Sequence, residues 1–280
     1  MRTPRVAAIH DMSGFGRCSL TVAIPVLSAM GLQCCPLPTA FLSTHTGGFE
    51  GFSFLDMTDE MPRVADHWKT MDMDFKCIYS GFLGSERQIE IVSEFIRDFR
   101  QKDTVVVVDP VMGDHGAVYQ TYTPAMCEGM VHLAEQADVI VPNLTEAALL
   151  LGIPYGELPT GETGCREIVE QLSLEGRRSV VLTGASAAPD LTGAMCFDAK
   201  SGQTENIQVS RVPREFYGTG DVFASVLAGA LVKGTALPEA TRQAVEFVRA
   251  CAERTAEQNL PIREGVDFEP LLGLLTGGKG

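Results

Sequence analysis

Short apolar runs, rich in valine and isoleucine, recur along the whole chain and predict β-strands. The runs "VVVV" at 105–108 and "VIV" at 139–141 show no alternation of apolar and polar residues. That pattern is typical of strands buried on both faces of a parallel sheet. The predicted strands are Val6–His10, Cys34–Pro38, Cys77–Phe82, Thr104–Asp109, Val139–Pro142, Ser179–Thr183 and Ala194–Phe197.

Between these runs, the apolar residues follow helical spacing. In residues 85–99 they recur on one helical face, and Ser85 stands where an N-terminal cap is needed. A second helix is expected over 160–176, ended by Gly176. Further helices are predicted over 144–152, from about Thr219, and over 237–258 with Pro238 in its first turn.

This alternation of strands and helices predicts an α/β fold. We expect a three-layer sandwich, with a mostly parallel central sheet and helices on both faces. No repeat or linker divides the sequence, so a single domain over residues 1–280 is expected, with 276–280 as a loose tail. In such folds ligands bind beyond the carboxyl ends of the strands, and the polar clusters below follow directly on predicted strands.

The charge balance narrows the range of partners. The chain has 36 acidic and 22 basic residues, a formal net charge of −14. This argues against nucleic acid or an anionic membrane as the main partner, because both need a basic face. A small phosphorylated ligand remains compatible, since it needs only local positive potential. The eight cysteines form no C-x-x-C pair, and the N-terminal apolar run is too short for a signal peptide, so a reduced, cytoplasmic protein is expected.

The segment "GTGD" at 218–221 is the first candidate site. Gly218, Thr219 and Gly220 would form a turn that opens a helix, and free backbone amides at that position attract phosphate. Asp221 follows in the first helical turn. It has two interpretations: it stabilises the helix dipole, or it is a general base that takes a proton from a hydroxyl attacking the bound phosphate.

Two further clusters carry carboxylates. Asp109 ends a buried strand and Asp114 lies in the following loop. These carboxylates could bind a metal or a polar ligand, or they could be aspartates that simply favour a turn. Asn143 and Glu146 lie where a strand gives way to a helix. Their spacing suits a capping box, and the alternative is a pair of oxygen ligands for Mg²⁺ and its waters.

The remaining candidates are weaker by themselves. Thr183, in a Thr-Gly pair after a strand, offers a hydroxyl to a phosphate. His45 and Thr46 precede a glycine-rich loop, although a lone histidine is more often structural than catalytic. Near the N-terminus, "GFGRCS" at 14–19 approaches the dinucleotide fingerprint but has Ser19 in the third glycine position and no acidic residue ending the next strand.

Taken together and in this order, the clusters resemble the ribokinase superfamily. The blocks "FLSTHTGG", "DPVMGD", "ADVIVPNLTEAALLLG", "VVLTG" and "GTGDVFASVLAGAL" are similar to blocks of that superfamily, and "STHTG" is similar to its pyridoxal kinases. The resemblance implies a cytoplasmic, homodimeric kinase that uses ATP and Mg²⁺, with a monovalent cation left open. It would phosphorylate the 5′-hydroxymethyl group of a vitamin B6 compound.

The resemblance also implies roles for single residues. Asp221 would be the base, and Gly218, Thr219 and Gly220 the anion hole. Asp109 and Glu146 would serve the metal, and Asp11, His45 and Thr46 would border the substrate ring. The residues expected to contact ATP are Asn143, Thr183, Asp114 and Tyr122.

Asp11 departs from the pyridoxal kinase pattern, which has a serine at this position. The segment "IHDMSG" at 9–14 is closer to the hydroxymethylpyrimidine kinases of thiamine synthesis, so a pyrimidine kinase is the main alternative. Two other classes stay open at this point: a dinucleotide-dependent oxidoreductase that uses the loop at 14–19, and a non-catalytic binding protein of the same fold.

Overall fold

The computed structural model describes residues 2–276, and its centre is a nine-stranded sheet. The strands are β1 (Arg5–Ser13), β2 (Gln33–Leu42), β3 (Phe54–Asp56), β4 (Cys77–Ser80), β5 (Val105–Val108), β8 (Val139–Ile140), β9 (Ser179–Thr183), β10 (Leu191–Asp198) and β11 (Gln203–Ser210). A separate two-stranded ribbon consists of β6 (Gly113–Asp114) and β7 (Ala117–Val118). All seven predicted strands are present.

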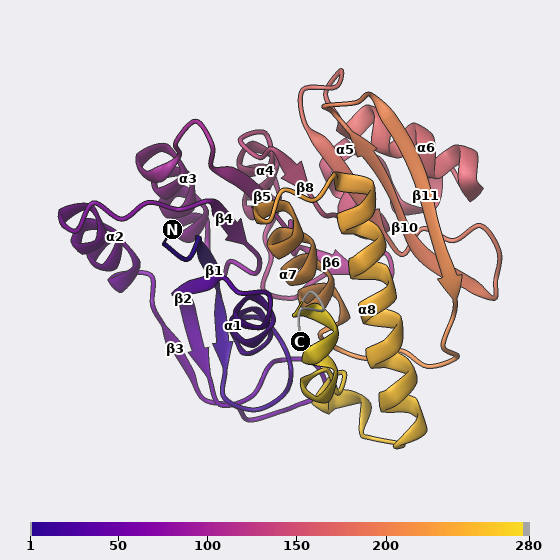
Figure 1. Ribbon diagram of the computed structural model, residues 1–280, viewed down its shortest axis with the longest axis horizontal. Coiled ribbons are helices and arrows are strands. Elements are labelled where there is room, and N and C mark those ends of the chain that lie inside the picture. The colour runs from indigo at the N-terminus through magenta and orange to yellow at the C-terminus, as the bar shows by residue number, and fades with distance from the viewer. Residues whose placement is uncertain (1, 277–280) are drawn as a thin grey trace.

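Helices cover both faces of this sheet (Figure 1). They are α1 (Leu20–Ala29), α2 (Glu60–Thr70), α3 (Glu86–Phe99), α4 (Pro124–Ala134), α5 (Leu144–Leu151), α6 (Gly161–Leu172), α7 (Thr219–Val232) and α8 (Leu237–Glu257). Short 3-10 helices are η1 (Tyr155–Glu157), η2 (Ile262–Glu264) and η3 (Glu269–Leu275). Helices α2 to α6 bury their apolar residues on one face, and α1, α7 and α8 on the other. This arrangement confirms the predicted three-layer α/β sandwich.

The strand order is β11-β10-β9-β8-β5-β4-β1-β2-β3. The six strands from β9 to β2 are parallel neighbours, while β10, β11 and β3 join the sheet antiparallel. From β1 the chain moves to β2 on one side, and from β4 it moves to β5 on the other. The strand order therefore reverses between β1 and β4, which is where α/β sheets of this type hold ligands.

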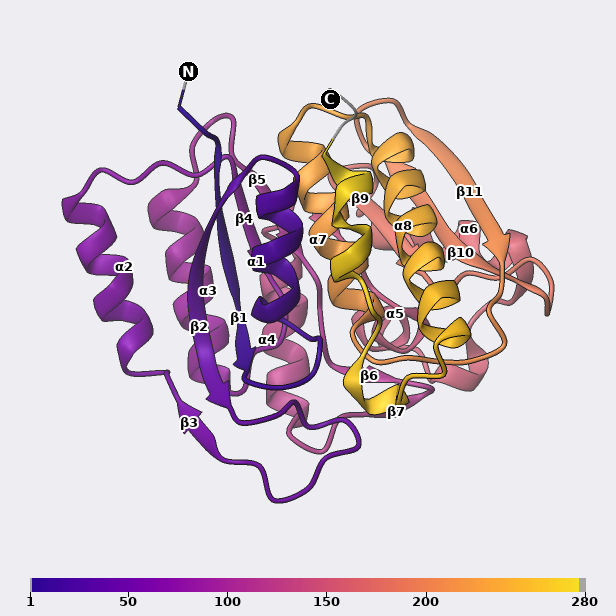
Figure 2. The same ribbon diagram turned by 60° about the horizontal axis from the view of Figure 1, so that its bottom comes forward.

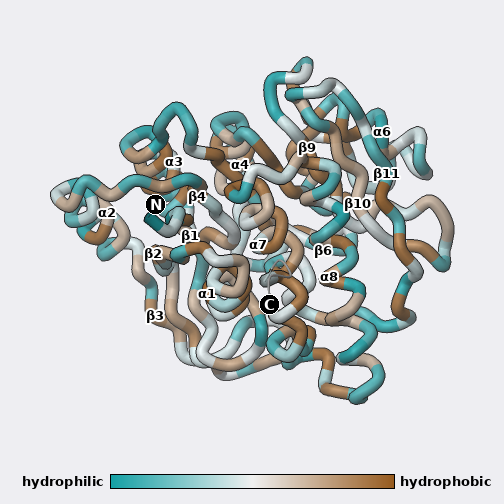
Figure 3. The backbone as a smooth tube through the Cα atoms, viewed as in Figure 1, coloured by the Kyte–Doolittle hydropathy of each residue, from teal (hydrophilic) through white to brown (hydrophobic). Residues whose placement is uncertain are grey.

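Helix α7 is almost entirely apolar because it is buried on most of its surface. Its residues from Val222 to Ala230 are buried, and Figure 3 shows the apolar colour along it. A Cβ at Gly229 would lie 2.4 Å from Met30 Sδ, at the end of α1. The absence of a side chain at this position allows α7 to pack closely against α1.

The predicted helix boundaries are confirmed with one correction. Ser85 caps α3 by accepting a hydrogen bond from the Gln88 amide, and α8 begins at Leu237 with Pro238 in its first turn. Helix α6, however, ends at Leu172 rather than at Gly176, because the Ser173 hydroxyl bonds to the backbone of the last turn and accepts from the Gly176 amide. Helix α7 begins at Thr219, as predicted, and Gly218 occupies the cap position.

Two expectations concern the extent of the domain. The single domain over residues 1–280 stays a prediction, and of the expected tail over 276–280, all but Thr276 lies outside the described residues. Among the helices of the described part, none combines the length and apolar character needed to cross a membrane.

Candidate active site

The carboxyl ends of the parallel strands meet at one edge of the sheet, which points downward in Figure 2 and has the β6–β7 ribbon beside it. Asp109 follows β5, Asn143 follows β8, and Thr183 is the last residue of β9. Asp11 lies near the end of β1, where the pairing with β2 shifts by one residue. The fold thus brings together candidates that are far apart in the sequence.

The N-terminus of α7 forms a turn that only glycine fits. Gly218 has φ +77°, and a Cβ at this residue would lie 1.9 Å from the Arg17 carbonyl oxygen. At Gly220 a Cβ would meet no other heavy atom within 4 Å. The first turn of α7 therefore packs tightly against the Arg17 backbone at Gly218 and has open space beside Gly220. The backbone amides in the first turn of a helix lack intrahelical partners, which suits the binding of an anion.

Asp221 lies in the first turn of α7, with 19% of its side chain exposed. Burial is the main cause that raises its pKa to about 7. The Ser19 backbone amide lowers this pKa, and the negative charge of Asp11 raises it. A carboxylate with a pKa near neutrality exchanges protons readily at physiological pH, as a general base must.

Asp11 is buried and receives two hydroxyl groups. Its Oδ1 accepts a hydrogen bond from Ser19 Oγ at 2.6 Å, and its Oδ2 accepts one from Ser13 Oγ at 3.1 Å. Burial raises the pKa of the carboxyl, although both hydroxyl bonds oppose this. Each carboxylate oxygen retains a second lone pair, so Asp11 can still accept from a ligand N–H.

Asp109 and Glu146 form a buried acidic pair. Burial raises the pKa of both well above the usual range. The charge of Asp221 adds to the effect at Asp109, and the charge of Asp109 adds to it at Glu146. A divalent cation would offset this repulsion, so the donor set fits Mg²⁺.

The protein would supply only a few ligands to such an ion. Within residues 2–276, no group of three or more His, Cys, Asp or Glu side chains could hold a metal ion. Mg²⁺ commonly takes one or two carboxylates and completes its shell with water and substrate phosphate. The pair of Asp109 and Glu146 is compatible with that mode of binding.

The first turn of α5 anchors the β6–β7 ribbon. Asn143 Oδ1 accepts from the Glu146 amide, while its Nδ2 donates to the Gly113 carbonyl oxygen at 2.9 Å. Thr145 Oγ1 accepts from the Gly116 amide at 2.9 Å. Both polar groups of the Asn143 side chain are therefore occupied by the protein, and its predicted contact with ATP stays a prediction.

The ribbon presents residues of different exposure. Asp114 is exposed, and its Oδ1 accepts from the His115 amide. Tyr122, in the loop after the ribbon, is buried and its ring packs against Phe82, and its predicted contact with ATP stays a prediction. Tyr119 is 40% exposed, and the carboxylates of Glu146, Asp114, Asp109 and Asp221 all raise its pKa, after burial. Sequence reasoning missed Tyr119, although the segment "VYQTYT" offers both tyrosines.

Thr183 and Gly184 form the edge of the site beyond β9. The Thr183 amide donates to the Pro142 carbonyl oxygen at 2.9 Å, which aligns this strand end with the turn before α5. Gly184 has φ +69°, and a Cβ there would meet no other heavy atom within 4 Å. The Thr183 hydroxyl itself donates to the Pro142 carbonyl oxygen at 3.4 Å, and its predicted phosphate contact stays a prediction.

His45 is buried and connects three segments. Its Nδ1 accepts a hydrogen bond from the Gly47 amide at 3.1 Å, and its Nε2 lies 2.6 Å from the Arg263 carbonyl oxygen. The ring contacts Phe49 and Tyr217, the residue before Gly218. Because both nitrogens are engaged, His45 can meet a ligand through its ring but has no nitrogen left to bind one.

A surface cavity of about 610 Å³ lies next to this histidine. It is lined by Thr46, Gly48, Phe49, Glu50 and Arg263. The guanidinium of Arg263 stacks over the Phe49 ring, 5.3 Å from its centroid. Of the predicted substrate residues, Thr46 alone lines this cavity.

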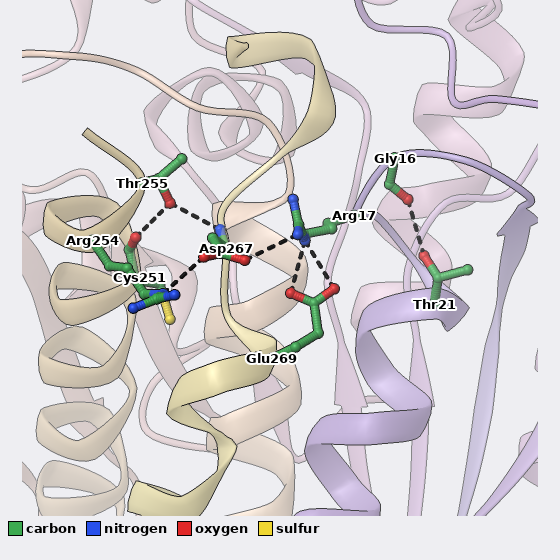
Figure 4. A network of polar contacts seen from close by, with 8 residues as sticks. All are labelled: Gly16, Arg17, Thr21, Cys251, Arg254, Thr255, Asp267 and Glu269. Carbon is green, nitrogen blue, oxygen red and sulfur yellow. Dashed lines mark hydrogen bonds and ion pairs between the residues drawn. The ribbon is translucent and has the colours of Figure 1, made fainter. Parts of the chain in front are cut away.

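Arg17 fixes the loop after β1 to the C-terminal segment (Figure 4). Its Nε donates to both carboxylate oxygens of Glu269 at 2.8 Å, and its Nη2 donates to Asp267 Oδ1 at 3.0 Å. Asp267 Oδ2 in turn accepts from Arg254 Nε at 2.7 Å. Since the Arg17 carbonyl backs Gly218, this network holds one wall of the candidate anion site.

The comparisons with known proteins show the family of this chain. A family model described as phosphomethylpyrimidine kinase matches residues 23–266, which is most of the chain. The chain belongs to this family. It is a phosphotransferase that acts on an alcohol group, and the resemblance to the ribokinase superfamily is confirmed. Family membership leaves no support for the dinucleotide oxidoreductase.

Similar proteins cover nearly the whole chain. A candidate phosphomethylpyrimidine kinase from Bacteroides thetaiotaomicron, in an orthorhombic crystal form with pyridoxal, is 43% identical with a TM-score of 0.92, covering 98% of this chain and 96% of that one. Pyridoxal kinase from Lactobacillus plantarum is 32% identical with a TM-score of 0.90, covering 98% and 97%. A pyridoxine/pyridoxal/pyridoxamine kinase from Bordetella bronchiseptica is 28% identical over 90% of this chain and 89% of that protein.

Proposed function

We propose that this kinase transfers the γ-phosphoryl group of ATP to the 5′-hydroxymethyl group of pyridoxal, pyridoxamine or pyridoxine. The observation that supports this proposal most is the position of Asp221. This carboxylate has a pKa of about 7 and lies in the first turn of a helix that has open space beside Gly220. The names of the relatives from Lactobacillus and Bordetella, and the pyridoxal in the Bacteroides crystal, support a vitamin B6 substrate over a pyrimidine.

Asp221 has the central role in the proposed reaction. Its carboxylate accepts the hydroxyl proton as the alcohol oxygen forms its bond to the γ-phosphorus. The bond between that phosphorus and the bridging oxygen breaks, and ADP leaves with the bonding electron pair. The products are the phosphate ester, ADP and a proton that Asp221 later releases to water.

The glycine turn acts on the phosphoryl group. Gly218, Thr219 and Gly220 lie at the N-terminus of α7, where backbone amides favour negative charge, so these amides are proposed to stabilise the oxygens of the transferring group. The acid and the anion site are thus neighbours with separate partners: Asp221 serves the alcohol, and the amides serve the phosphate.

Asp109 and Glu146 would hold Mg²⁺ together with its waters. When bound, the ion neutralises phosphate charge and orients the transferring group. Asn143 supports this arrangement by fixing the first turn of α5, and Thr183, Asp114 and Tyr122 are the other residues proposed to contact ATP. Binding of a monovalent cation, assembly as a homodimer and a cytoplasmic location also remain predictions from the family resemblance.

The substrate ring is proposed to lie between Asp11 and the loop that carries His45 and Thr46. His45 contributes its ring, since its nitrogens are engaged, and Asp11 accepts from a ring N–H or an amine. This predicts a preference for pyridoxamine. The Asp11→Ser variant tests it: an unchanged order of preference among the three B6 compounds would contradict this role.

The deciding experiment measures ADP release from Mg·ATP with pyridoxal, pyridoxamine, pyridoxine or hydroxymethylpyrimidine as the acceptor, each supplied separately. The phosphate ester is identified by mass spectrometry, so that ATP hydrolysis is not counted. We expect at least one B6 compound to be turned over well above the pyrimidine. Turnover of the pyrimidine alone would overturn the proposed substrate, and the absence of turnover with all four would overturn the proposed function.

A further inference from the structure

His10 is a fully buried histidine directly behind the candidate base. It lies on β1, on the sheet face that α7 covers, and its ring meets the Tyr79 ring edge-on with the centroids 4.4 Å apart. The ring occupies space left by a glycine, because a Cβ at Gly81 would lie 2.1 Å from His10 Cε1. The imidazole is therefore packed against Tyr79 of the neighbouring strand β4 and against Gly81, which follows that strand.

Both ring nitrogens of His10 lack a hydrogen-bond partner among residues 2–276. A neutral imidazole has one donor and one acceptor, and leaving either unpaired in the interior costs free energy. Burial lowers the pKa of His10 to about 3, so the ring is neutral at physiological pH. His45 is also buried, but its two nitrogens are satisfied by the backbone, which makes the unpaired state of His10 a distinguishing feature.

Asp221 is the group that His10 faces. The His10 Nδ1 lies 4.0 Å from Asp221 Oδ1, slightly beyond hydrogen-bond distance. A side-chain adjustment of about 1 Å closes this gap, and catalytic hydrogen bonds are often long until a site is filled. The other groups whose charges act on Asp221 or respond to it are acids, namely Asp11, Asp109, Cys18, Tyr79 and Tyr119.

We propose that His10 is a positioning residue for Asp221. Its Nδ1–H donates to the Asp221 carboxylate and holds that carboxylate toward the substrate hydroxyl. His10 itself touches neither substrate nor phosphate. The proposal rests on the proposed function of Asp221 as the general base, and it gives a role to the residue beside Asp11, to which the sequence analysis assigned none.

Two variants of similar size separate positioning from packing. His10→Asn retains a donor at the place of Nδ1, whereas His10→Leu fills the space without one. We expect kcat of His10→Leu to fall about 10- to 100-fold with KM within about twofold, and kcat of His10→Asn to stay within about threefold of wild type. His132→Asn, on the exposed surface of α4, is the matched control for losing a histidine and should leave both constants unchanged.

Equal losses in His10→Asn and His10→Leu would show that the ring only fills space and would overturn the proposal. Full activity in a folded His10→Leu protein would overturn it as well. Unfolding midpoints of the variants establish that each is folded before the kinetic constants are compared.

A second measurement does not depend on turnover, and so distinguishes this proposal from the proposed function. NMR of the ¹⁵N-labelled histidines identifies the tautomer of each ring, and His10→Asn assigns the His10 signals. We expect His10 to carry its proton on Nδ1 and its signals to shift in Asp221→Ala. An Nε2–H tautomer, or signals unchanged by Asp221→Ala, would overturn the proposal even if the kinase activity is confirmed.

Discussion

Asn143 and Glu146 bond to each other in both directions at the start of α5. Glu146 Oε2 accepts from the Asn143 amide at 2.8 Å, and Asn143 Oδ1 accepts from the Glu146 amide at 2.9 Å. The other oxygen, Glu146 Oε1, accepts from the Met112 amide at 3.2 Å. The capping box inferred from the spacing is confirmed, and its carboxylate also lies within the buried acidic pair with Asp109.

The double role of Glu146 leads to a prediction about two variants. Glu146→Gln retains only one of the two oxygens that accept from the Asn143 and Met112 amides, so it should lower the free energy of unfolding, but by less than Glu146→Ala, which removes both acceptors and should lower it by about 1–3 kcal/mol. If Glu146 orders Mg²⁺, Glu146→Gln should raise the Mg²⁺ concentration for half-maximal turnover by about tenfold or more. Urea unfolding and Mg²⁺ titration measure the two effects. An unchanged Mg²⁺ dependence would remove Glu146 from the metal site.

The role of Asp221 predicts a folded but nearly inactive variant. Asp221→Asn keeps the size of the side chain and removes its basicity, so kcat should fall by at least about two orders of magnitude. Binding of ATP should persist, because the amides of the α7 turn are unchanged. Turnover and equilibrium binding of ATP are the measurements. Near-normal turnover would exclude Asp221 as the base.

The pKa of Asp221 also sets the pH dependence. A base must be ionised to act, so kcat/KM should rise about tenfold per pH unit below the Asp221 pKa of about 7 and level off above it. The negative charge of Asp11 raises this pKa, so Asp11→Asn should move the acid limb to lower pH. A pH–rate profile of wild type and of Asp11→Asn tests the direction of this shift. An acid limb that stays in place or moves upward in Asp11→Asn would contradict this assignment.

The sequence allowed the fold class and the sites at strand ends to be predicted, because long apolar runs and glycine turns are local signals. Four strands were not among the predicted ones. Strands β3, β6 and β7 are two or three residues long and their side chains are mostly exposed, and β11 fully buries only Ile207. The pairing of His10 with Asp221 was not predictable, as the two residues are 211 positions apart and no motif joins them. The same holds for His45 and the Arg263 carbonyl, 218 positions apart.

The two glycines of the α7 turn should differ in their tolerance of a methyl group. Gly218→Ala places a Cβ 1.9 Å from the Arg17 carbonyl at φ +77°, so it should destabilise the protein by about 1–3 kcal/mol and distort the anion site. Gly220→Ala meets no other atom within 4 Å and lies within the helix, so its free energy of unfolding should stay equal or rise by up to about 1 kcal/mol. Urea unfolding of both variants checks this. Equal stability of the two would show that the Gly218 turn relaxes without cost.

His10 should make the stability of the protein sensitive to acid. Its pKa is about 3 in the folded chain against about 6.5 when unfolded, so below pH 6.5 the unfolded state binds a proton that the folded state does not. The stabilising contribution is complete above pH 6.5 and is lost as the pH falls toward 3, amounting to about 3 kcal/mol between pH 7 and pH 4. His10→Asn should lack this loss.

Comparing wild type with His10→Asn separates the pH dependence of stability caused by His10 from that caused by the buried carboxyl groups of the site. Asp11, Asp109, Glu146 and Asp221 have raised pKa values, so they favour the folded state as the pH falls, and they are present in both proteins. The difference in unfolding free energy between wild type and His10→Asn should therefore shift by about 3 kcal/mol from pH 7 to pH 4 in urea titrations, with His132→Asn as the control. A difference that stays constant with pH would mean that His10 takes up its proton at the same pH in the folded and unfolded protein, so that Asp221 would face an imidazolium once the pH falls below about 6.5.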